Sequence, residues 1–192
     1  MRLAGARYQA EIAGFRNALT NYIYYRDTGE QTSRGLPIYQ ATGTDAVLQG
    51  AEATVTVEAL RNVVVNSVVS WVRGSFADSD RPLPMMPPLR GQLSLRYERP
   101  GFSAGTTWRA AARQDRVAAD EFETPTRGYS AFDADAGVRW TAFGRVQSVT
   151  LRVDNFTDEI VYDHLSRIRD RESDERVPGP GRSASLIYRV VF

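Results

Sequence analysis

The one histidine of the chain, His164, is the side chain best suited to metal chemistry. Carboxylates stand near it in the sequence, at Asp158, Glu159 and Asp163. Imidazole and carboxylate groups together suit zinc and iron. The pattern therefore predicts a metal site made by His164, Asp163 and Asp158, with the alternative that His164 is a solvated loop residue.

Catalytic chemistry is not indicated by the rest of the sequence. A serine–histidine–aspartate triad would have to be built around His164, but Asp163 and Ser166 are only sequence neighbours and no nucleophile elbow is present. Cysteine is absent, which excludes thiolate metal sites and cysteine nucleophiles. No glycine-rich nucleotide motif occurs. We therefore expect no enzyme and no cofactor.

The charge balance excludes another class of function. The formal net charge is +1, and all 24 basic residues are arginine. No basic field points to nucleic acid, because such partners require clustered positive charge. Nucleic acid is therefore not an expected partner.

The elements that position these residues are predicted by a repeated alternation of apolar and polar side chains. Near the end of the chain Val149, Leu151 and Val153 alternate with Thr150 and Arg152. This period of two is typical of strands with one apolar face. The candidate strands are about 6–25, 51–59, 62–76, 92–98, 102–110, 132–140, 148–154 and 183–192, and the faces of 62–76 are not assigned because that segment alternates poorly.

The connections between these strands alternate in length. Short turns are predicted at 60–62, 99–101 and 143–145, and long polar loops at about 27–46, 77–89, 113–128 and 155–181. Outer-membrane barrels have this arrangement, with short turns at one rim and long loops at the other. A compact soluble domain seldom has several loops of such length. The expected fold is all-β, with about eight antiparallel up-and-down transmembrane β-barrel strands.

A membrane interpretation has to rest on strands. The longest apolar stretch, 62–71, is far shorter than the roughly 20 residues that a transmembrane helix needs. A closed sheet pairs its backbone groups within lipid, and its charged residues can face a wet interior. Two alternatives remain: a self-contained eight-stranded barrel with a structural or adhesive role, and a soluble β-sandwich binding module.

Several stretches together resemble the C-terminal β-barrel region of TonB-dependent outer-membrane receptors. The clearest are LRVDNFTDEIVYDHLS at 151–166, PGPGR at 178–182, and the alternating strand that ends on an aromatic residue. Family members show an apolar strand running into Asn-Leu-Phe-Asp, then a Tyr, a Pro-Gly-Arg and a terminal aromatic. Here Thr157 is inserted in the spacing, and Phe156 stands where Leu is commoner. The residues that match the motif are Asn155, Phe156, Asp158, Tyr162, Pro178, Gly181, Arg182 and Phe192.

Upstream segments match the same family in the same order, so the resemblance covers nearly all of residues 1–192. Segment 15–30 resembles the Phe-x-Asn strand, 50–52 its Gly-x-Glu step, and 82–97 its proline-rich loop. The loop and the Tyr-Asp-His segment are most similar to receptors for zinc-type or iron-type cargo.

The resemblance implies active uptake of a nutrient, such as a metal chelate or siderophore, across the outer membrane of a Gram-negative bacterium. It implies partnership with outer-membrane lipid, with the plug and N-terminal barrel strands of the receptor, and with the TonB complex through that plug. It also implies that the barrel-assembly machinery recognises the strand ending at Phe192. We expect the chain to be the last third of a 22-stranded barrel, without the plug and signal peptide.

Overall fold

The computed structural model describes residues 1–121, 123–168 and 175–191. These residues form nine β-strands and one short 3₁₀ helix, η1 (Ala119–Glu121). The strands are β1 (Arg2–Gly5), β2 (Tyr8–Gln31), β3 (Pro37–Leu60), β4 (Val63–Phe76), β5 (Arg90–Arg99), β6 (Phe102–Ala111), β7 (Tyr129–Ala142), β8 (Arg145–Asp154) and β9 (Ser183–Val191).

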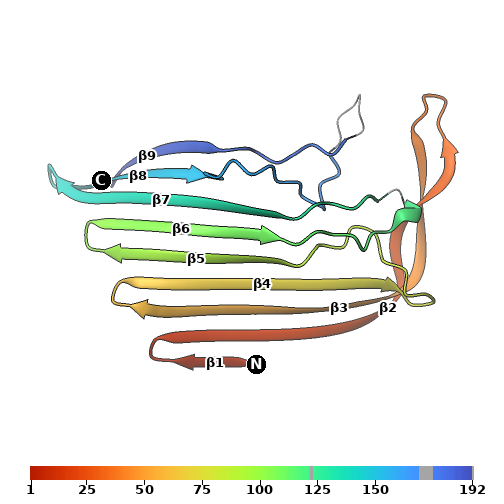
Figure 1. Ribbon diagram of the computed structural model, residues 1–192, viewed down its shortest axis with the longest axis horizontal. Helices are drawn as coiled ribbons and strands as arrows, with labels where there is room; N and C mark the ends of the chain where they lie inside the picture. The colour runs from red at the N-terminus through yellow and green to blue at the C-terminus, as the bar shows by residue number, and fades with distance from the viewer. Residues whose placement is uncertain (122, 169–174, 192) are drawn as a thin grey trace.

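All nine strands belong to a single sheet whose order follows the chain from β1 to β9, and every neighbouring pair is antiparallel. Figure 1 shows the tight turns at one end of the sheet, the turn end, and the longer connections at the other, the loop end. The predicted all-β, up-and-down arrangement is confirmed. The count differs by one, because the short strand β1 was not predicted.

The predicted long loop at 27–46 is wrong. Strands β2 and β3 pair through most of this segment, with Asp27 opposite Tyr39, so that only residues 32–36 remain as the connection. The segment is polar, but it contains four threonines together with Ile38 and Tyr39, residue types that favour strands. The ladder is interrupted by a bulge between Leu19 and Tyr22, where Asn21 has a positive φ of 57°. Beyond this bulge the hairpin bends away from the other strands (Figure 1).

The three predicted short turns are confirmed. Residues 61–62 connect β3 to β4, residues 100–101 connect β5 to β6, and residues 143–144 connect β7 to β8. Phe143 and Gly144 both have positive φ, at 54° and 71°, as the two-residue turn that matches the twist of a hairpin requires. Glycine adopts that conformation without steric cost.

The register places the predicted apolar residues on one continuous face. Leu151 lies opposite Ala136 on β7 and opposite Leu186 on β9. Leu186 is 71% exposed, and many large apolar residues of this face are similarly open to the surroundings. An apolar surface this extensive marks an interaction with another protein or with a membrane. The predicted alternation of faces is therefore confirmed for β8 and its neighbours.

Strand β4, whose faces the sequence left unassigned, carries valine on both sides. Val65 lies opposite Leu95 and shares the apolar face, whereas Val64 lies opposite Arg96 on the polar face. This double use of valine explains why β4 alternates poorly.

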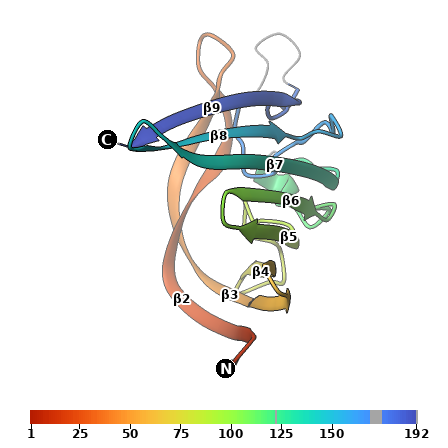
Figure 2. The same cartoon turned by 90° about the vertical axis from the view of Figure 1, so that its left-hand side faces the viewer.

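The sheet is a curved single layer, as Figure 2 shows. The polar side chains of β5 to β8 line a recess in it, so the polar face is concave and the apolar face is convex. Among the described residues β1 and β9 do not pair with each other, so the sheet is an open arc. The β-sandwich alternative is wrong, because no second sheet packs on the first within the described ranges. No helix in the described part of the chain is long and apolar enough to span a membrane.

Candidate functional site

The concave face carries arginine–aspartate pairs that run from strand to strand. Arg96 on β5 reaches over Gly105 on β6 and pairs with Asp135 on β7, with 3.3 Å between Nη1 and Oδ2. A Cβ atom at Gly105 would lie 2.9 Å from the Asp135 carboxylate, so the glycine makes room for the pair. The outer strands thus contribute one charge each, and the middle strand provides the space between them.

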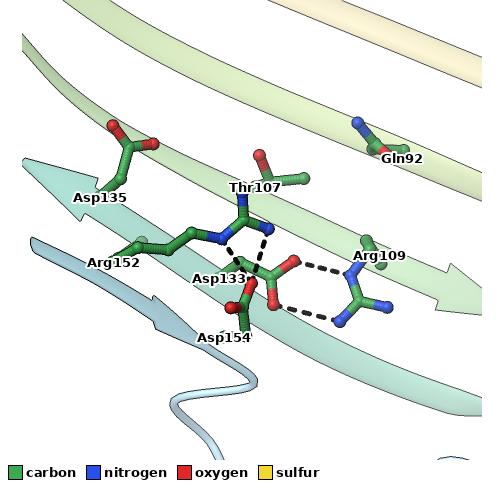
Figure 3. A pocket seen from close by; sticks show the side chains of 8 residues that line it. Gln92, Thr107, Arg109, Asp133, Asp135, Arg152 and Asp154 are labelled. Atoms are coloured by element: carbon green, nitrogen blue, oxygen red, sulfur yellow. Dashed lines mark hydrogen bonds and ion pairs between the residues drawn. The ribbon is translucent and has the colours of Figure 1, made fainter. Parts of the chain in front are cut away.

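The second pair is closer and more enclosed. Arg109 on β6 donates two hydrogen bonds to Asp133 on β7, at 2.7 and 3.1 Å. Asp133 also accepts a hydrogen bond from the backbone N–H of Asn155, at 2.8 Å. Figure 3 shows this paired geometry, with Arg152 and Asp154 of β8 bonded to each other beside it. The Asp133 carboxylate therefore ties together β6, β7 and the end of β8.

These residues surround an open recess of about 500 Å³, which is lined by Gln92, Thr107, Arg109, Asp133, Ala134, Asp135, Arg152 and Asp154. The positive and negative groups are paired along the wall, so the lining is strongly polar without a large field of one sign. Such a surface is suited to contact with water and with polar partners. It has no nucleophile–base pair that would indicate catalysis.

A second cluster lies at the loop end, where three loops meet around Glu123 and His164. The His164 Nε2 atom lies 3.0 Å from Glu123 Oε1, and His164 Nδ1 lies 2.8 Å from the Thr126 hydroxyl. The Nε2 contact is short, but its angles depart from those of a well-aligned hydrogen bond. The side chains of Glu123 and His164 are only 6% and 1% exposed. We name Glu123, Thr126 and His164 the loop node.

Glu123 also accepts two backbone hydrogen bonds. The N–H of Met85 donates to Oε1 and the N–H of Ala118 donates to Oε2, both at 2.8 Å. Burial raises the pKa of the Glu123 carboxyl, but His164 and the two backbone donors outweigh burial and hold the pKa below its ordinary 4.5. The ionised Glu123 carboxylate therefore stabilises the folded state fully above pH 4.5. This stabilisation is lost as the pH falls through the lowered pKa of Glu123.

The replacement His164→Ala is expected to raise the pKa of Glu123, because burial then acts against only the two backbone donors. NMR titration of the Glu123 carboxyl carbon in the folded protein would measure this shift directly. The wild-type midpoint is expected below 4.5 and the variant midpoint above that of the wild type. An unchanged midpoint would show that His164 does not influence the carboxylate.

An apolar cluster holds the proline-rich loop against the sheet. Leu83 of the proline-rich loop is fully buried, and it packs with Ala46 on β3 and Phe76 on β4. The Tyr24 ring meets the Phe76 ring edge-on, with centroids 5.1 Å apart, and Met86 packs against the same cluster. The loop is therefore folded back onto the strand ends.

The structure gives His164 different partners from those predicted by the sequence. Asp163 Oδ1 accepts the N–H of Leu165, and Asp158 Oδ1 accepts the N–H of Arg182, so both carboxylates are engaged within their own loop. No three metal-binding side chains come together in the described part of the chain. A metal role for His164, Asp163 and Asp158 stays a prediction that these contacts do not support. The solvated-loop alternative is wrong, since His164 is 3% exposed.

The family-motif residues organise the segment that follows β8. Asn155 is buried with a positive φ of 50°, and its side-chain amide exchanges two hydrogen bonds with the backbone of Glu159. The Phe156 ring lies 5.8 Å from that of Phe132, and Arg127 lies over the Tyr162 ring.

The Pro-Gly-Arg segment closes back on this turn. Asp158 bonds to the N–H of Arg182, and a Cβ atom at Gly181 would lie 3.3 Å from the same carboxylate. After Pro178, the N–H of Gly179 donates to the Val161 carbonyl at 2.8 Å. Phe192 lies outside the described residues, so its predicted role stays a prediction.

The comparisons with known proteins agree with this geometry. Residues 1–156 match the family model described as TonB dependent receptor-like, beta-barrel. The chain belongs to this family. The resemblance seen in the sequence is thereby confirmed, and the family is one of receptors rather than enzymes. The comparison with curated protein sequences finds no match.

Three solved structures illustrate the likeness. The copper transporter OprC matches with a TM-score of 0.85 and 27% identity, over 95% of this chain and 29% of that one. A mutant of the ferric enterobactin receptor PfeA from Pseudomonas aeruginosa matches at 0.69 and 16%, over 99% and 30%. The FrpB iron transporter from Neisseria meningitidis matches at 0.69 and 17%, over 96% and 28%. The last two show the fold alone.

The chain spans less than a third of the length of these receptors. It therefore corresponds to an arc of their barrels, which agrees with the open sheet of the described residues.

Sequence reasoning missed Glu123, Thr126 and the pairing of Asp133 with Arg109. The alternation placed Asp133 and Arg109 on polar faces, but their contact depends on the register between β6 and β7. Glu123 lies in a loop with no periodic signal. Its contact with His164 could have been predicted only if both residues were known to be buried. The sequence does not show which loop residues are buried.

Proposed function

We propose that this chain forms part of the wall and outer mouth of a TonB-dependent outer-membrane receptor that imports a metal-containing nutrient. The observation that carries the proposal is the likeness to the copper transporter OprC. It extends over nearly the whole of this chain and includes 27% sequence identity as well as the shared fold. The convex face would contact lipid, the concave face would line the lumen, and the loop end would be extracellular.

The dimensions of the convex face support contact with a bilayer. Trp140 near the turn end and Phe132 toward the loop end lie on the same face of β7, about 26 Å apart at roughly 3.3 Å per residue. That separation is on the scale of the ~25 Å apolar band of outer-membrane barrels, which aromatic residues flank on both sides. Trp108 on β6 lies opposite Phe132, so two neighbouring strands place an aromatic residue toward the loop end of this face.

The partners follow from this proposal. The paired charges of the concave face would meet water and the plug, the edges of the arc would meet the remaining barrel strands, and TonB would act through the plug. The barrel-assembly machinery would insert the whole receptor into the outer membrane. The alternative of a self-contained eight-stranded barrel has less support, because the nine-stranded sheet is open in the described residues.

Uptake measurements on the intact gene test the proposal. Deletion of the gene is expected to abolish high-affinity uptake of one metal species under limitation, and a plasmid copy is expected to restore it. Radiolabelled copper is the first cargo to measure, and a panel of ferric siderophores is the second. Loss of TonB should have the same effect as deletion. If deletion of the gene left the uptake of every cargo unchanged, the proposal would be contradicted.

A further inference from the structure

The loop node joins three separate loops of the sheet. Met85 belongs to the connection between β4 and β5, Glu123 to that between β6 and β7, and His164 to that between β8 and β9. The Glu123 carboxylate contacts all three, because it accepts from Met85, accepts from Ala118 in its own loop, and faces His164. One buried side chain thus fixes the relative positions of three loops.

The contact with Met85 shapes the proline-rich loop. Met85 has a φ of 60°, a left-handed conformation that is unfavourable for a residue with a side chain. Its N–H points into the Glu123 carboxylate, which compensates for that cost. The next carbonyl, that of Met86, accepts a hydrogen bond from Gln114 at 2.9 Å. The loop between β6 and β7 therefore holds both methionines in place.

The third loop is fastened from two sides. Thr126 bonds to the His164 ring, and Arg176 Nη1 donates to the His164 carbonyl at 2.7 Å. Because the His164 ring is almost fully buried, it is not open to a cargo. Its contacts are those of a positioning residue rather than those of a ligand.

We propose that Glu123 and His164 are positioning residues that lock the three loops into one unit and set the shape of the mouth through which the cargo enters. The inference rests on the proposed function only in its reference to cargo. The coupling between loops is a property of the chain itself. A locked rim would raise cargo affinity by reducing the ordering that binding requires, since preorganisation lowers the cost of association.

Hydrogen exchange on the intact receptor tests the coupling. The replacement Glu123→Gln removes the charge and one acceptor, so amide exchange should rise about ten- to hundredfold in all three loops, as expected for the loss of charge-assisted hydrogen bonds. His164→Gln should raise exchange at Met85, which lies in a different loop. The double variant should add little to Glu123→Gln, because the residues act as a unit.

Glu121→Gln is the matched control. It makes the same change two residues away, where the carboxylate accepts the N–H of Asp27 on β2 and takes no part in the loop node. It should leave exchange at Met85 unchanged. Heat-modifiable gel migration should show a folded barrel in every variant, because the loop node lies outside the strands.

Cargo binding separates this inference from the proposed function. With the metal species found by the uptake assay, Glu123→Gln should raise Kd about tenfold and leave the maximal uptake rate unchanged. If no cargo is found, the exchange result still decides the coupling. The inference would be overturned if amide exchange rose only in the mutated loop. It would also be overturned if Glu121→Gln raised exchange as much as Glu123→Gln does.

Discussion

Replacing Leu151 by Arg is expected to prevent assembly into the outer membrane, whereas Thr150→Arg is expected to be tolerated. The two positions are adjacent on β8, but Leu151 lies on the convex apolar face and Thr150 on the concave polar face. An arginine at the lipid midplane costs about 2–4 kcal/mol. On the concave face the same side chain would reach water and the neighbouring carboxylates.

Surface-exposed, heat-modifiable protein in whole cells is the appropriate measurement. Arg152→Leu provides a further comparison, since it removes a charge from the concave face and leaves Asp154 accessible to water. We expect folded protein near the wild-type level for Thr150→Arg and Arg152→Leu. Equal loss in all three variants would refute the assignment of faces, because each face would then be equally intolerant of its substitution.

The faces of the sheet could be predicted from the sequence because strand side chains alternate with a fixed period. Val149, Leu151 and Val153 show the pattern without any knowledge of their neighbours. The prediction failed where composition hides the period. Strand β4 has valine on both faces, and the far half of the β2–β3 hairpin is largely polar. The unassigned faces of β4 and the wrong loop at 27–46 both follow from equating a strand with an apolar stripe.

The candidate site was less predictable because its contacts join distant parts of the chain. The pairing of Arg96 with Asp135 requires knowing that Gly105 lies between them in the register. His164 was singled out for its chemistry, but its partner proved to be Glu123 in another loop rather than the nearby Asp163. Sequence proximity suggested a metal site, whereas the fold brings His164 into contact with the buried Glu123 carboxylate.

The paired charges of the concave face differ in enclosure, and this difference predicts unequal effects of the same substitution. Asp133→Asn is expected to lower the free energy of unfolding by about 1.5–3 kcal/mol, the range for hydrogen bonds to charged groups. Asp133 is 14% exposed, accepts two bonds from Arg109, and accepts the N–H of Asn155. The asparagine side chain keeps one acceptor oxygen, but its NH₂ group then faces a hydrogen-bond donor of Arg109 or Asn155, so at least one of these bonds is lost.

Asp135→Asn is the matched control on the same strand and the same face. Its carboxylate is 32% exposed and meets Arg96 at 3.3 Å, and Arg96 also has Glu98 as a second partner. Solvent-screened pairs of this kind contribute about 0–1 kcal/mol. Urea unfolding of the intact receptor in lipid vesicles would measure both variants.

The double variant Arg109→Gln with Asp133→Asn isolates the pair itself. It should lose little more stability than Asp133→Asn alone, because the second substitution removes an arginine that has already lost its partner. The bond from Asp133 to Asn155 is independent of Arg109, so Arg109→Gln alone should be the milder single variant. Equal losses for Asp133→Asn and Asp135→Asn would show that enclosure does not set the strength of these pairs. The wall would then be stabilised by its backbone ladder, with the charges serving mainly to keep the concave face wet.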